Sequence, residues 1–483
     1  MTDWLANHAR HRADKAAVIE LATGRRIVYD ELNRRANQIR ALLAGLGVRP
    51  GDRVGVLAGN CVELLEVLFG ATKLGAIFVP LNWKLTAAEL APILADAEPV
   101  VLFHTVEHAE LAQTIFRGRR VELSGATASD LPSDDPAEIP ADLESPQILL
   151  YTSGTTGKPK GVVLSHRMIL WNSINFSLRD LAATDTVLVH TPMFYTGGLN
   201  VYALPSLFLG GTVVVMKAFS PDEVLSTVER EKITVLFAVP TQLLMMADCP
   251  VFNSADLSSL RYVISGGAPC PVALIQRWVD RGVPFKQGFG LTEVGPNCFA
   301  LEAKDALRKA GSIGFPHFSI EARIIDVEGG IGELVLRTPA MCSGYWNNPE
   351  QTAAAIRDGW FHTGDLAMFD SEGYCFIVDR KKDMFISGGE NVYPAEVESV
   401  LREHPKIADV AVFGVPHPKW GEVGCAAVVL REGESSTEEE ILTFCAGRIA
   451  KFKIPKSIKW MLELPRTVSG KIKKRELLLS DQN

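Results

Sequence analysis

The chain has 483 residues, of which 47% are hydrophobic and 22% are charged. This composition excludes an intrinsically disordered protein, and the length exceeds that of one compact core, so two or three domains are expected. The 57 acidic side chains outnumber the 49 of Lys and Arg, which gives a net charge of −8 and makes a nucleic-acid partner unexpected.

Apolar runs and cysteines narrow the class of protein further. No run reaches the ~18 residues of a membrane span; residues 67–80 come nearest, and Lys73 interrupts them. The first residues show no basic segment leading into an apolar one, as a secretory signal would. The eight cysteines form no CxxC pair, so neither a zinc site nor a disulfide framework is expected. We therefore expect reduced, buried thiols and a cytoplasmic location.

Short apolar runs alternate with segments of helical spacing through the first half of the chain. Strands are predicted at residues 54–58, 76–79, 99–103, 186–190, 212–216, 234–239 and 261–264, and helices at 62–74 and 87–95. Residues 125–146 are rich in Ala, Asp, Pro and Ser and indicate a surface connector. This alternation predicts an α/β fold with a doubly wound parallel sheet.

The last third of the chain has a different pattern. Residues 312–378 are β-rich and punctuated by glycine, which predicts a β-rich subdomain, and the charged segment 379–383 (DRKKD) follows. We place a domain boundary there, between a large domain of residues 1–379 and a small α+β domain of residues 380–483. In the small domain we expect helices at 394–403 and 438–450 and strands at 408–413, 425–430 and 457–462.

Residues 151–161 (YTSGTTGKPKG) follow an apolar strand and combine glycines, hydroxyls and two lysines. Glycine lets backbone N–H groups approach an anion closely, and the hydroxyls and lysines add donors and charge. The segment is not a Walker A loop, because Thr152 stands where that motif needs Gly and Pro159 where it needs Ser or Thr. A solvated turn is the alternative, but this density of donors favours a polyphosphate site.

This segment resembles the phosphate loop of the adenylate-forming superfamily, which includes acyl-CoA synthetases, the adenylation domains of peptide synthetases and beetle luciferase. Further segments similar to those of the family follow in the family's order: GFGLTE (288–293), TGD (363–365), DRKKD (379–383), GGENVYPAE (388–396) and PRTVSGK (465–471). The resemblance therefore covers residues 151–471 and favours the acyl-CoA synthetase branch. It implies a mobile small domain that acts as a lid.

The resemblance implies a reaction in two steps. A carboxylate attacks the α-phosphate of ATP and releases pyrophosphate, and the acyl-adenylate then transfers its acyl group to CoA and releases AMP. The implied catalytic residues are Thr292, which contacts the α-phosphate, Glu293, which holds Mg²⁺, and Lys471, which bridges the carboxylate and the α-phosphate. The implied nucleotide-binding residues are Thr152, Ser153, Gly154, Thr155, Thr156, Gly157, Lys160, Gly267, Ala268, Pro269, Gly288, Phe289, Gly290, Asp365 and Arg380.

Single residues in these segments have ordinary alternatives. Phe289 stands where the family commonly has a tyrosine stacked on adenine, so the aromatic face is kept without the hydroxyl. Asp365 matches the acid that accepts both ribose hydroxyls, and Arg380 matches a residue that reaches the ribose or the phosphate. Outside these motifs, each charge would be an ordinary surface group, and residues 265–269 an ordinary turn at the end of a strand.

The second step assigns a further set of residues. The resemblance implies a hinge at Lys382 and a channel for the pantetheine arm of CoA beside Gly388 and Gly389, where the alternative is a tight turn. Lys451 and Lys453 are candidates for CoA phosphate contacts, and a solvated helix end explains them equally well. The implied acyl pocket contains Phe194, Tyr195, Thr196, Gly197 and Gly266. Its small residues leave room for an apolar or aromatic acid, although Tyr195 replaces the histidine of many CoA ligases.

We therefore expect an ATP-dependent ligase whose partners are a small carboxylic acid, ATP and CoA, with Mg²⁺ as its metal and a homodimer as one possible assembly. Free CoA is favoured over a carrier protein because twelve residues follow Lys471, too few for a fused carrier domain. An enzyme that loads a separate carrier is the first alternative, and a silent nucleotide binder is the second. Medium- and long-chain fatty acids, benzoates, cinnamates and succinylbenzoate all stay open as the acid.

Overall fold

The computed structural model describes residues 3–125, 127–136, 138–153, 159–387, 390–418, 420–446, 448–466, 470 and 472–479. The chain divides into two compact units, the first made of Met1–Ala322 with Leu336–Phe361 and the second of Arg323–Val335 with His362–Asn483. The boundary expected between residues 379 and 380 concerns which parts move, and it stays a prediction.

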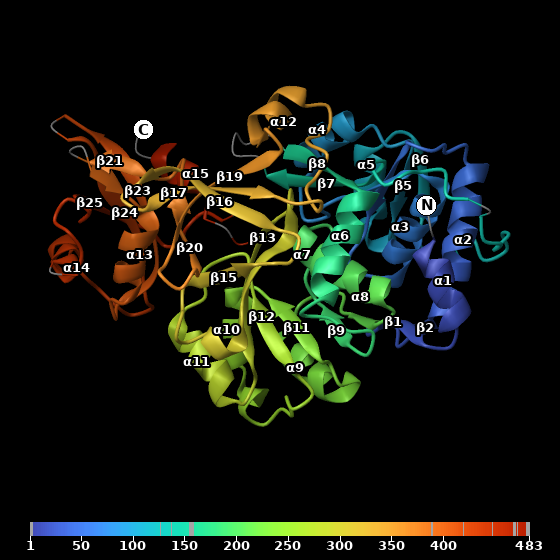
Figure 1. Cartoon of the computed structure of the whole chain (residues 1–483), viewed down its shortest axis with the longest axis horizontal. Helices are drawn as coiled ribbons and strands as arrows, with labels where there is room; N and C mark the ends of the chain where they lie inside the picture. The colour runs from blue at the N-terminus through green and yellow to red at the C-terminus, as the bar shows by residue number, and fades with distance from the viewer. Residues whose placement is uncertain are drawn as a thin grey trace. The chain divides into compact units, whose positions relative to one another are not determined.

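The first unit contains two sheets (Figure 1). In the larger one, β1, β10, β9, β11, β12 and β13 are parallel neighbours, and β2, β14 and β15 are antiparallel additions. Its strands, in spatial order, are β15 (Ser312–Pro316), β14 (Gly295–Leu301), β13 (Phe285–Leu291), β12 (Tyr262–Ser265), β11 (Val235–Ala238), β9 (Thr186–Val189), β10 (Thr212–Val215), β1 (Ala16–Glu20) and β2 (Arg26–Val28).

The second sheet is parallel except at one edge, where β7 and β8 form an antiparallel pair. Its order is β6 (Arg119–Glu122), β5 (Val101–His104), β3 (Arg53–Leu57), β4 (Ile77–Pro80), β7 (Pro146–Ser153) and β8 (Pro159–Ser165). Continuous apolar runs such as β4 and β10 are buried at every position, as strands covered on both faces must be.

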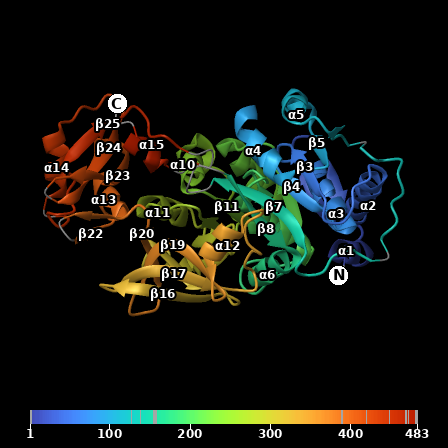
Figure 2. The same cartoon turned by 90° about the horizontal axis from the view of Figure 1, so that it is seen from above.

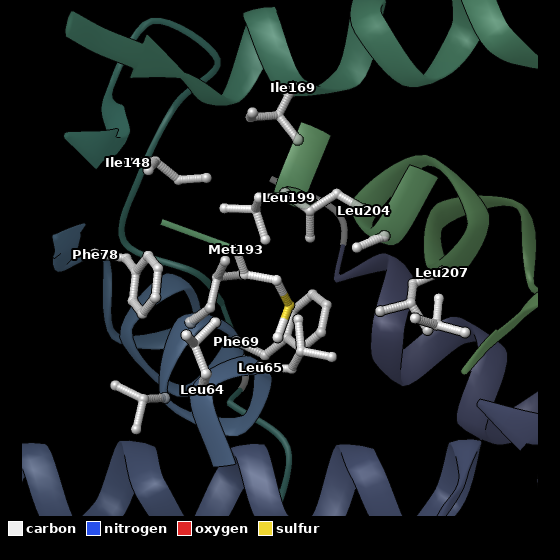
Figure 3. Packing of buried hydrophobic residues seen from close by; sticks show 14 of the residues in the cluster. Leu64, Leu65, Phe69, Phe78, Ile148, Ile169, Met193, Leu199, Leu204 and Leu207 are labelled. Carbon is white, nitrogen blue, oxygen red and sulfur yellow. The ribbon is translucent and has the colours of Figure 1, made fainter. Parts of the chain in front are cut away.

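The main core joins the two sheets through the helices α2 (Tyr29–Gly45), α3 (Val62–Leu74), α6 (His166–Ser177) and α8 (Leu204–Leu209). Figure 3 shows Leu65 and Phe69 of α3 close to Met193, with Phe78 and Ile148 from the second sheet on one side and Leu204 and Leu207 of α8 on the other. Residues 62–74 are mostly apolar, and α3 is accordingly buried along nearly all its length.

Helices also cover the outer faces of both sheets. A second core packs α9 (Pro221–Glu231), α10 (Pro240–Asp248) and α11 (Val272–Asp280) against β11 and β12, and these helices lie together in Figure 1. A third core packs α4 (Ala87–Ala97) and α5 (Ala109–Ile115) against the second sheet. The remaining elements of this unit are α1 (Trp4–His11), α7 (Thr196–Gly198), α12 (Pro349–Ala355), β18 (Ile356–Arg357), the 3₁₀ turns η1 (Val106–His108), η3 (Pro250–Asn253) and η4 (Ala303–Asp305), and the π turn η2 (Leu199–Ala203).

The second unit contains β strands and a small sheet with helices. The strands that lie mostly or wholly in it are β16 (Glu321–Glu328), β17 (Ile331–Arg337), β19 (Trp360–Phe369) and β20 (Cys375–Arg380). The small sheet contains β21 (Phe385–Ser387), β22 (Glu390–Val392), β23 (Ile407–His417), β24 (Gly421–Leu430) and β25 (Ser457–Trp460). Its helices are α13 (Pro394–Arg402), α14 (Glu438–Cys445) and α15 (Lys474–Leu479).

Alternation along β23 decides how this small sheet is covered. Val410 and Val412 face one core with Val397 and Leu401 of α13, and Figure 2 shows α13 beside β23 and β24. Ala411 and Phe413 face the other core, which includes Leu477 of α15. Among the residues that the structure describes, no helix is both long and apolar enough to cross a lipid bilayer.

Candidate functional site

Four neighbouring parallel strands, β9, β11, β12 and β13, end at one edge of the large sheet. Three groups of predicted site residues gather there: residues 194–197 follow β9, Gly266–Pro269 follow β12, and Gly288–Gly290 lie near the end of β13. Ligands of open α/β sheets bind at this carboxyl edge. The topology thus gathers segments that are about a hundred residues apart in sequence.

A small hollow opens beside this edge. Its walls are Leu188, Val189, Thr191, Gly197, Gly198, Tyr202 and Phe237. Of the predicted acyl-pocket residues, Gly197 lines it directly, and Gly266 lies against Phe237, because a Cβ added to Gly266 would be 3.1 Å from Phe237 Cε2. Phe237 therefore links two of the predicted residues.

Phe237 is a site residue that the sequence analysis missed. It belongs to β11, a strand in the middle of the sheet, yet it alone of the four residues in that strand is partly exposed. An apolar side chain at a central position is normally covered by neighbouring elements, so this exposure indicates a cavity wall. The only signal in the sequence was an aromatic residue near the carboxyl end of a predicted strand.

Tyr195 and Phe194 are held by aromatic and polar neighbours. The Tyr195 hydroxyl accepts a hydrogen bond of 3.0 Å from Asn82 Nδ2. Burial raises the pKa of Tyr195 to about 12, so its phenol is neutral at physiological pH. Phe194 is buried and contacts the rings of Tyr195 and Trp83 edge-on, with centroids 4.6 and 6.4 Å away. Thr196 begins α7 and accepts a hydrogen bond of 3.2 Å from Asn200.

His190 directly follows β9 and lies inside the first unit. Its side chain is buried, and this burial lowers its pKa to about 4. The ring lies 5.3 Å from that of Phe219, in an apolar environment. A neutral imidazole is the only form that this environment favours near pH 7, so we assign His190 to the core.

The β12–β13 edge continues the row of contacts from the hollow. A Cβ on Gly266 would lie 3.4 Å from the carbonyl oxygen of Gly288, so these two predicted glycines are neighbours. A Cβ on Gly290 would lie 2.1 Å from the backbone of Pro296, so only glycine fits in this hairpin. Phe289 is partly exposed and packs edge-on against Phe299 at 6.1 Å, so one face of its ring has a fixed backing.

The turn after β12 presents Gly267, Ala268 and Pro269 to solvent. Gly267 has φ +84°, a conformation that favours glycine. Phe289 lies in β13, the strand that pairs with β12 at this edge of the sheet. An exposed turn with small side chains leaves room for a planar base at this edge, as the sequence predicts.

The two ends of the predicted phosphate segment lie in the antiparallel strands β7 and β8, where Thr152 pairs with Lys160 and Ser153 with Pro159. Lys160 Nζ lies 5.2 Å from the centroid of the Tyr345 ring, a cation–π distance. Gly161 is closely packed, since a Cβ there would approach Leu149 to 2.8 Å and Trp346 Cβ to 3.2 Å. The predicted residues Gly154, Thr155, Thr156 and Gly157 lie outside the described residues.

Thr292 and Glu293 lie in the turn between β13 and β14 and are partly exposed. The Tyr345 hydroxyl donates a hydrogen bond of 3.0 Å to Glu293 Oε1, and the N–H of Cys342 donates one of 2.7 Å to the Glu293 carbonyl. Tyr345 is a second residue that the sequence analysis missed. Burial and the neighbouring carboxylate raise its pKa, so it is a neutral donor.

The number of carboxylates near Glu293 limits which metal ion this turn could hold. Within the described ranges there is no group of three His, Cys, Asp or Glu side chains that could hold a metal by itself. Mg²⁺ is commonly bound by one or two carboxylates together with substrate phosphates and water. The donor set at Glu293 therefore fits a magnesium ion that arrives with a nucleotide.

In the second unit, Asp365 and Arg380 are cross-strand partners in β19 and β20. Arg380 Nε lies 2.5 Å from Asp365 Oδ1; the Asp365 side chain is 3% exposed and that of Arg380 38% exposed. The structure thus brings together the two residues expected at the ribose. The next residue, Lys381, forms an ion pair of 2.9 Å with Glu333, and Lys382 is exposed in the turn that follows β20.

The remaining predicted residues are those of the second step, together with Lys471 of the first. Lys453 contacts both carboxylate oxygens of Glu396 at 2.7 Å, so its charge is already paired, while Lys451 is exposed. Gly388, Gly389 and Lys471 lie outside the described residues. The assignments of Lys382, Lys451 and Lys453 stay predictions.

A mostly parallel sheet whose carboxyl edge carries a hollow, with a partly exposed carboxylate in a turn near it, is typical of α/β enzymes that bind their ligands at this edge. The AMP-binding enzyme family matches residues 5–346, and the C-terminal domain of AMP-binding enzymes matches residues 396–471. The chain belongs to this family. The predicted superfamily, fold class and enzyme class, an acid–thiol ligase, are confirmed.

Named relatives cover nearly the whole chain. A feruloyl-CoA synthase of Amycolatopsis sp is 44% identical over 98% of this chain and 97% of its own, and an indoleacetate–CoA ligase of Aromatoleum aromaticum is 40% identical over 99% and 97%. A fatty acid–acyl-carrier-protein ligase, ScoC of Streptomyces coeruleorubidus, is 36% identical over 97% and 94%. The structure of the o-succinylbenzoate CoA synthetase MenE of Bacillus subtilis with ATP and magnesium matches with a TM-score of 0.89 and 30% identity, over 99% of each chain.

Proposed function

We propose that this chain joins an aromatic carboxylic acid to CoA, with ATP and Mg²⁺, and releases AMP and pyrophosphate. The observation that carries the proposal is the row of contacts at the carboxyl edge of the large sheet. It runs from the hollow through Phe237, Gly266 and Gly288 toward the Glu293 turn. An acyl group, an α-phosphate and a cation would thus lie in the order in which the first half-reaction needs them.

The candidate residues divide the tasks of the first step among them. Lys160, Thr152 and Ser153 bind the triphosphate, and Phe289 covers the adenine. Thr292 donates to the α-phosphate, where charge develops as the carboxylate attacks and pyrophosphate leaves. Glu293 would hold the magnesium ion, which would supply positive charge where the two anions must meet. The family resemblance assigns the ribose to Asp365 and Arg380.

The aromatic class of the acid rests on the walls of the hollow. Phe237 and Tyr202 both line the hollow, and Gly197 and Gly198 contribute no side chain to its wall. Planar ligands lose little conformational entropy when they bind against aromatic side chains, whereas an alkyl chain loses several torsions. Two relatives named above act, by their names, on feruloyl and indoleacetyl groups, which are both aromatic.

Free CoA is the proposed acceptor, and a carrier protein is the second candidate, because ScoC carries that activity in its name. The test is pyrophosphate release over a panel of acids that contains cinnamates, indoleacetate, benzoates and straight-chain fatty acids. We expect release with the aromatic acids, and faster turnover with CoA than without it. Turnover limited to alkyl acids would overturn the aromatic assignment, and acceleration by an acyl carrier protein but not by CoA would favour the second candidate.

A further inference from the structure

A short segment, Cys342–Trp346, connects the phosphate strand with the Glu293 turn. On one side this segment pairs with β8. The N–H of Ser343 donates to the Val163 carbonyl at 3.0 Å, and the N–H of Val163 donates to the Gly344 carbonyl at 3.0 Å. The N–H of Trp346 donates to the Gly161 carbonyl at 2.7 Å. On the other side, the N–H of Cys342 donates to the carbonyl of Glu293 at 2.7 Å. Backbone bonds therefore fix the spacing of two elements that are far apart in sequence.

The Tyr345 side chain also connects these two elements, because it contacts Glu293 on one and Lys160 on the other. Its hydroxyl donates to Glu293 Oε1 at 3.0 Å, and its ring lies 5.2 Å from Lys160 Nζ. The Tyr345 N–H donates to Thr352 Oγ1 at 2.9 Å, so the residue that carries the ring is itself anchored. One side chain thus contacts both the proposed metal carboxylate and a proposed phosphate-binding lysine.

A carboxylate on an exposed turn samples several rotamers, and a metal ligand must be held in one of them. A donor on Oε1 selects the rotamer and leaves the other carboxylate oxygen to face a cation. A cation held by Glu293 would therefore meet a carboxylate whose orientation is already set by the phenol.

We propose that Tyr345 is a positioning residue, which orients the Glu293 carboxylate for the magnesium–nucleotide and places Lys160 through its ring. This inference rests on the proposed function, because it assigns the metal to the nucleotide step. The two contacts make separate predictions: the hydroxyl acts on metal affinity, and the ring acts on the nucleotide itself. Removal of one group at a time separates them.

The test measures binding without any turnover. Mn²⁺ replaces Mg²⁺ and is followed by electron paramagnetic resonance, with a non-hydrolysable ATP analogue and the full chain. We expect Tyr345→Phe to weaken Mn²⁺ binding in the presence of the analogue roughly tenfold, as loss of a group that orients a metal ligand typically does. Affinity for the metal-free analogue should not change, because the ring over Lys160 is kept.

Tyr345→Leu removes the ring as well, so it should also weaken the metal-free analogue, by roughly two- to fivefold for a partly exposed cation–π contact. Tyr29→Phe is the matched control, since the Tyr29 hydroxyl donates to the buried carbonyl of Gly211 at 2.7 Å, far from these groups in the fold. It should lower the free energy of unfolding and leave Mn²⁺ affinity unchanged.

Two results would overturn the inference while the proposed function stands. In the first, Tyr345→Phe binds Mn²⁺ with the affinity of the wild type. In the second, Tyr345→Phe loses the same amount of affinity for the metal-free and the metal-bound analogue, which would indicate a structural role only. A wild-type protein that binds no Mn²⁺–nucleotide would instead overturn the proposed function, and the inference with it. As a second readout, excess Mg²⁺ should restore kcat in Tyr345→Phe, because the defect lies in occupancy of the site.

Discussion

Phe237 decides, at the scale of one side chain, how much space the acyl hollow has. A Cβ on Gly197 would lie 3.4 Å from Phe237 Cε1, and one on Gly266 3.1 Å from Cε2, so the ring fills the gap between two glycines. Loss of the ring joins the spaces beside these glycines. The choice among acids should therefore depend on this residue more than on any polar group nearby.

We predict that Phe237→Ala shifts preference from cinnamate toward bulkier acids such as naphthoate. The kcat/KM ratio should change roughly tenfold, since a change in pocket volume of a few carbon atoms is worth ~1–3 kcal/mol. The measurement is pyrophosphate release for both acids under the same conditions. Gly197→Ala is the matched control: its methyl group makes ordinary contact with Phe237 and narrows the hollow, so the ratio should move the opposite way. Equal losses for both acids in Phe237→Ala would contradict the prediction.

The difference between Phe237 and Glu293 shows what the sequence could supply at this scale. Glu293 and Asp365 lie in motifs of contiguous residues, so their identity was readable without a fold. Tyr345 lies 52 residues beyond Glu293, and no local pattern ties the two. Phe237 fits an ordinary strand pattern, and its exposure arises only when residues 197 and 266 come to lie on either side of it.

At the scale of elements, the hairpin of β13 and β14 carries Thr292 and Glu293 at its tip. Gly290 lies near the tip of this hairpin, and a Cβ added to it would be 2.1 Å from Pro296 C and O and 2.6 Å from Gly295 O. All three atoms belong to the backbone, so no rotamer change relieves the contact. The hairpin must open to admit a side chain.

We predict that Gly290→Ala lowers the free energy of unfolding by more than ~3 kcal/mol, the range in which forced backbone shifts add to overpacking. It should also reduce adenylate formation, because it displaces the turn that carries Glu293. Denaturant unfolding and pyrophosphate release measure the two effects. Gly311→Ala serves as the control: Gly311 has φ +89° and open space around it, so only the ~1 kcal/mol of a strained backbone is expected. A Gly290→Ala protein as stable as this control would exclude the close approach.

The boundaries of some elements are set by the local sequence, and those of others by partners that are distant in the sequence. Helix α3 begins and ends where its spacing predicted, at Val62 and Leu74, because Gly75 in a left-handed conformation ends it. Helix α14 ends at Cys445, earlier than the predicted residue 450, although the apolar pattern continues. Strands β8, β13 and β14 were not predicted, since their glycines and polar residues match partners across the sheet rather than a period within the strand.

At the scale of the whole molecule, the two half-reactions make incompatible demands on one site. The first needs a cation beside two meeting anions, and the second needs a thiol to reach the same carbonyl carbon. The family resemblance assigns the first task to Lys471 and the second to the passage at Gly389, both in the unit that contains α13 and α14. One lid with two separate segments can perform both tasks only in turn.

We predict that Lys471→Ala lowers adenylate formation by a factor of ~10²–10³, the usual cost of losing one preorganised contact to a developing charge. It should spare thioester formation from an acyl-adenylate supplied ready-made, because that step uses no lysine at the α-phosphate. The control is Lys473→Ala in the same basic run; Lys473 pairs with Glu476 at 2.8 Å, and both steps should keep their rates.

Gly389→Trp should give the reverse pattern, with pyrophosphate release intact and CoA transfer blocked. Since a general loss of folding would slow both steps together, opposite effects of Lys471→Ala and Gly389→Trp would separate the two tasks, and equal loss of both steps in each variant would refute the division of labour.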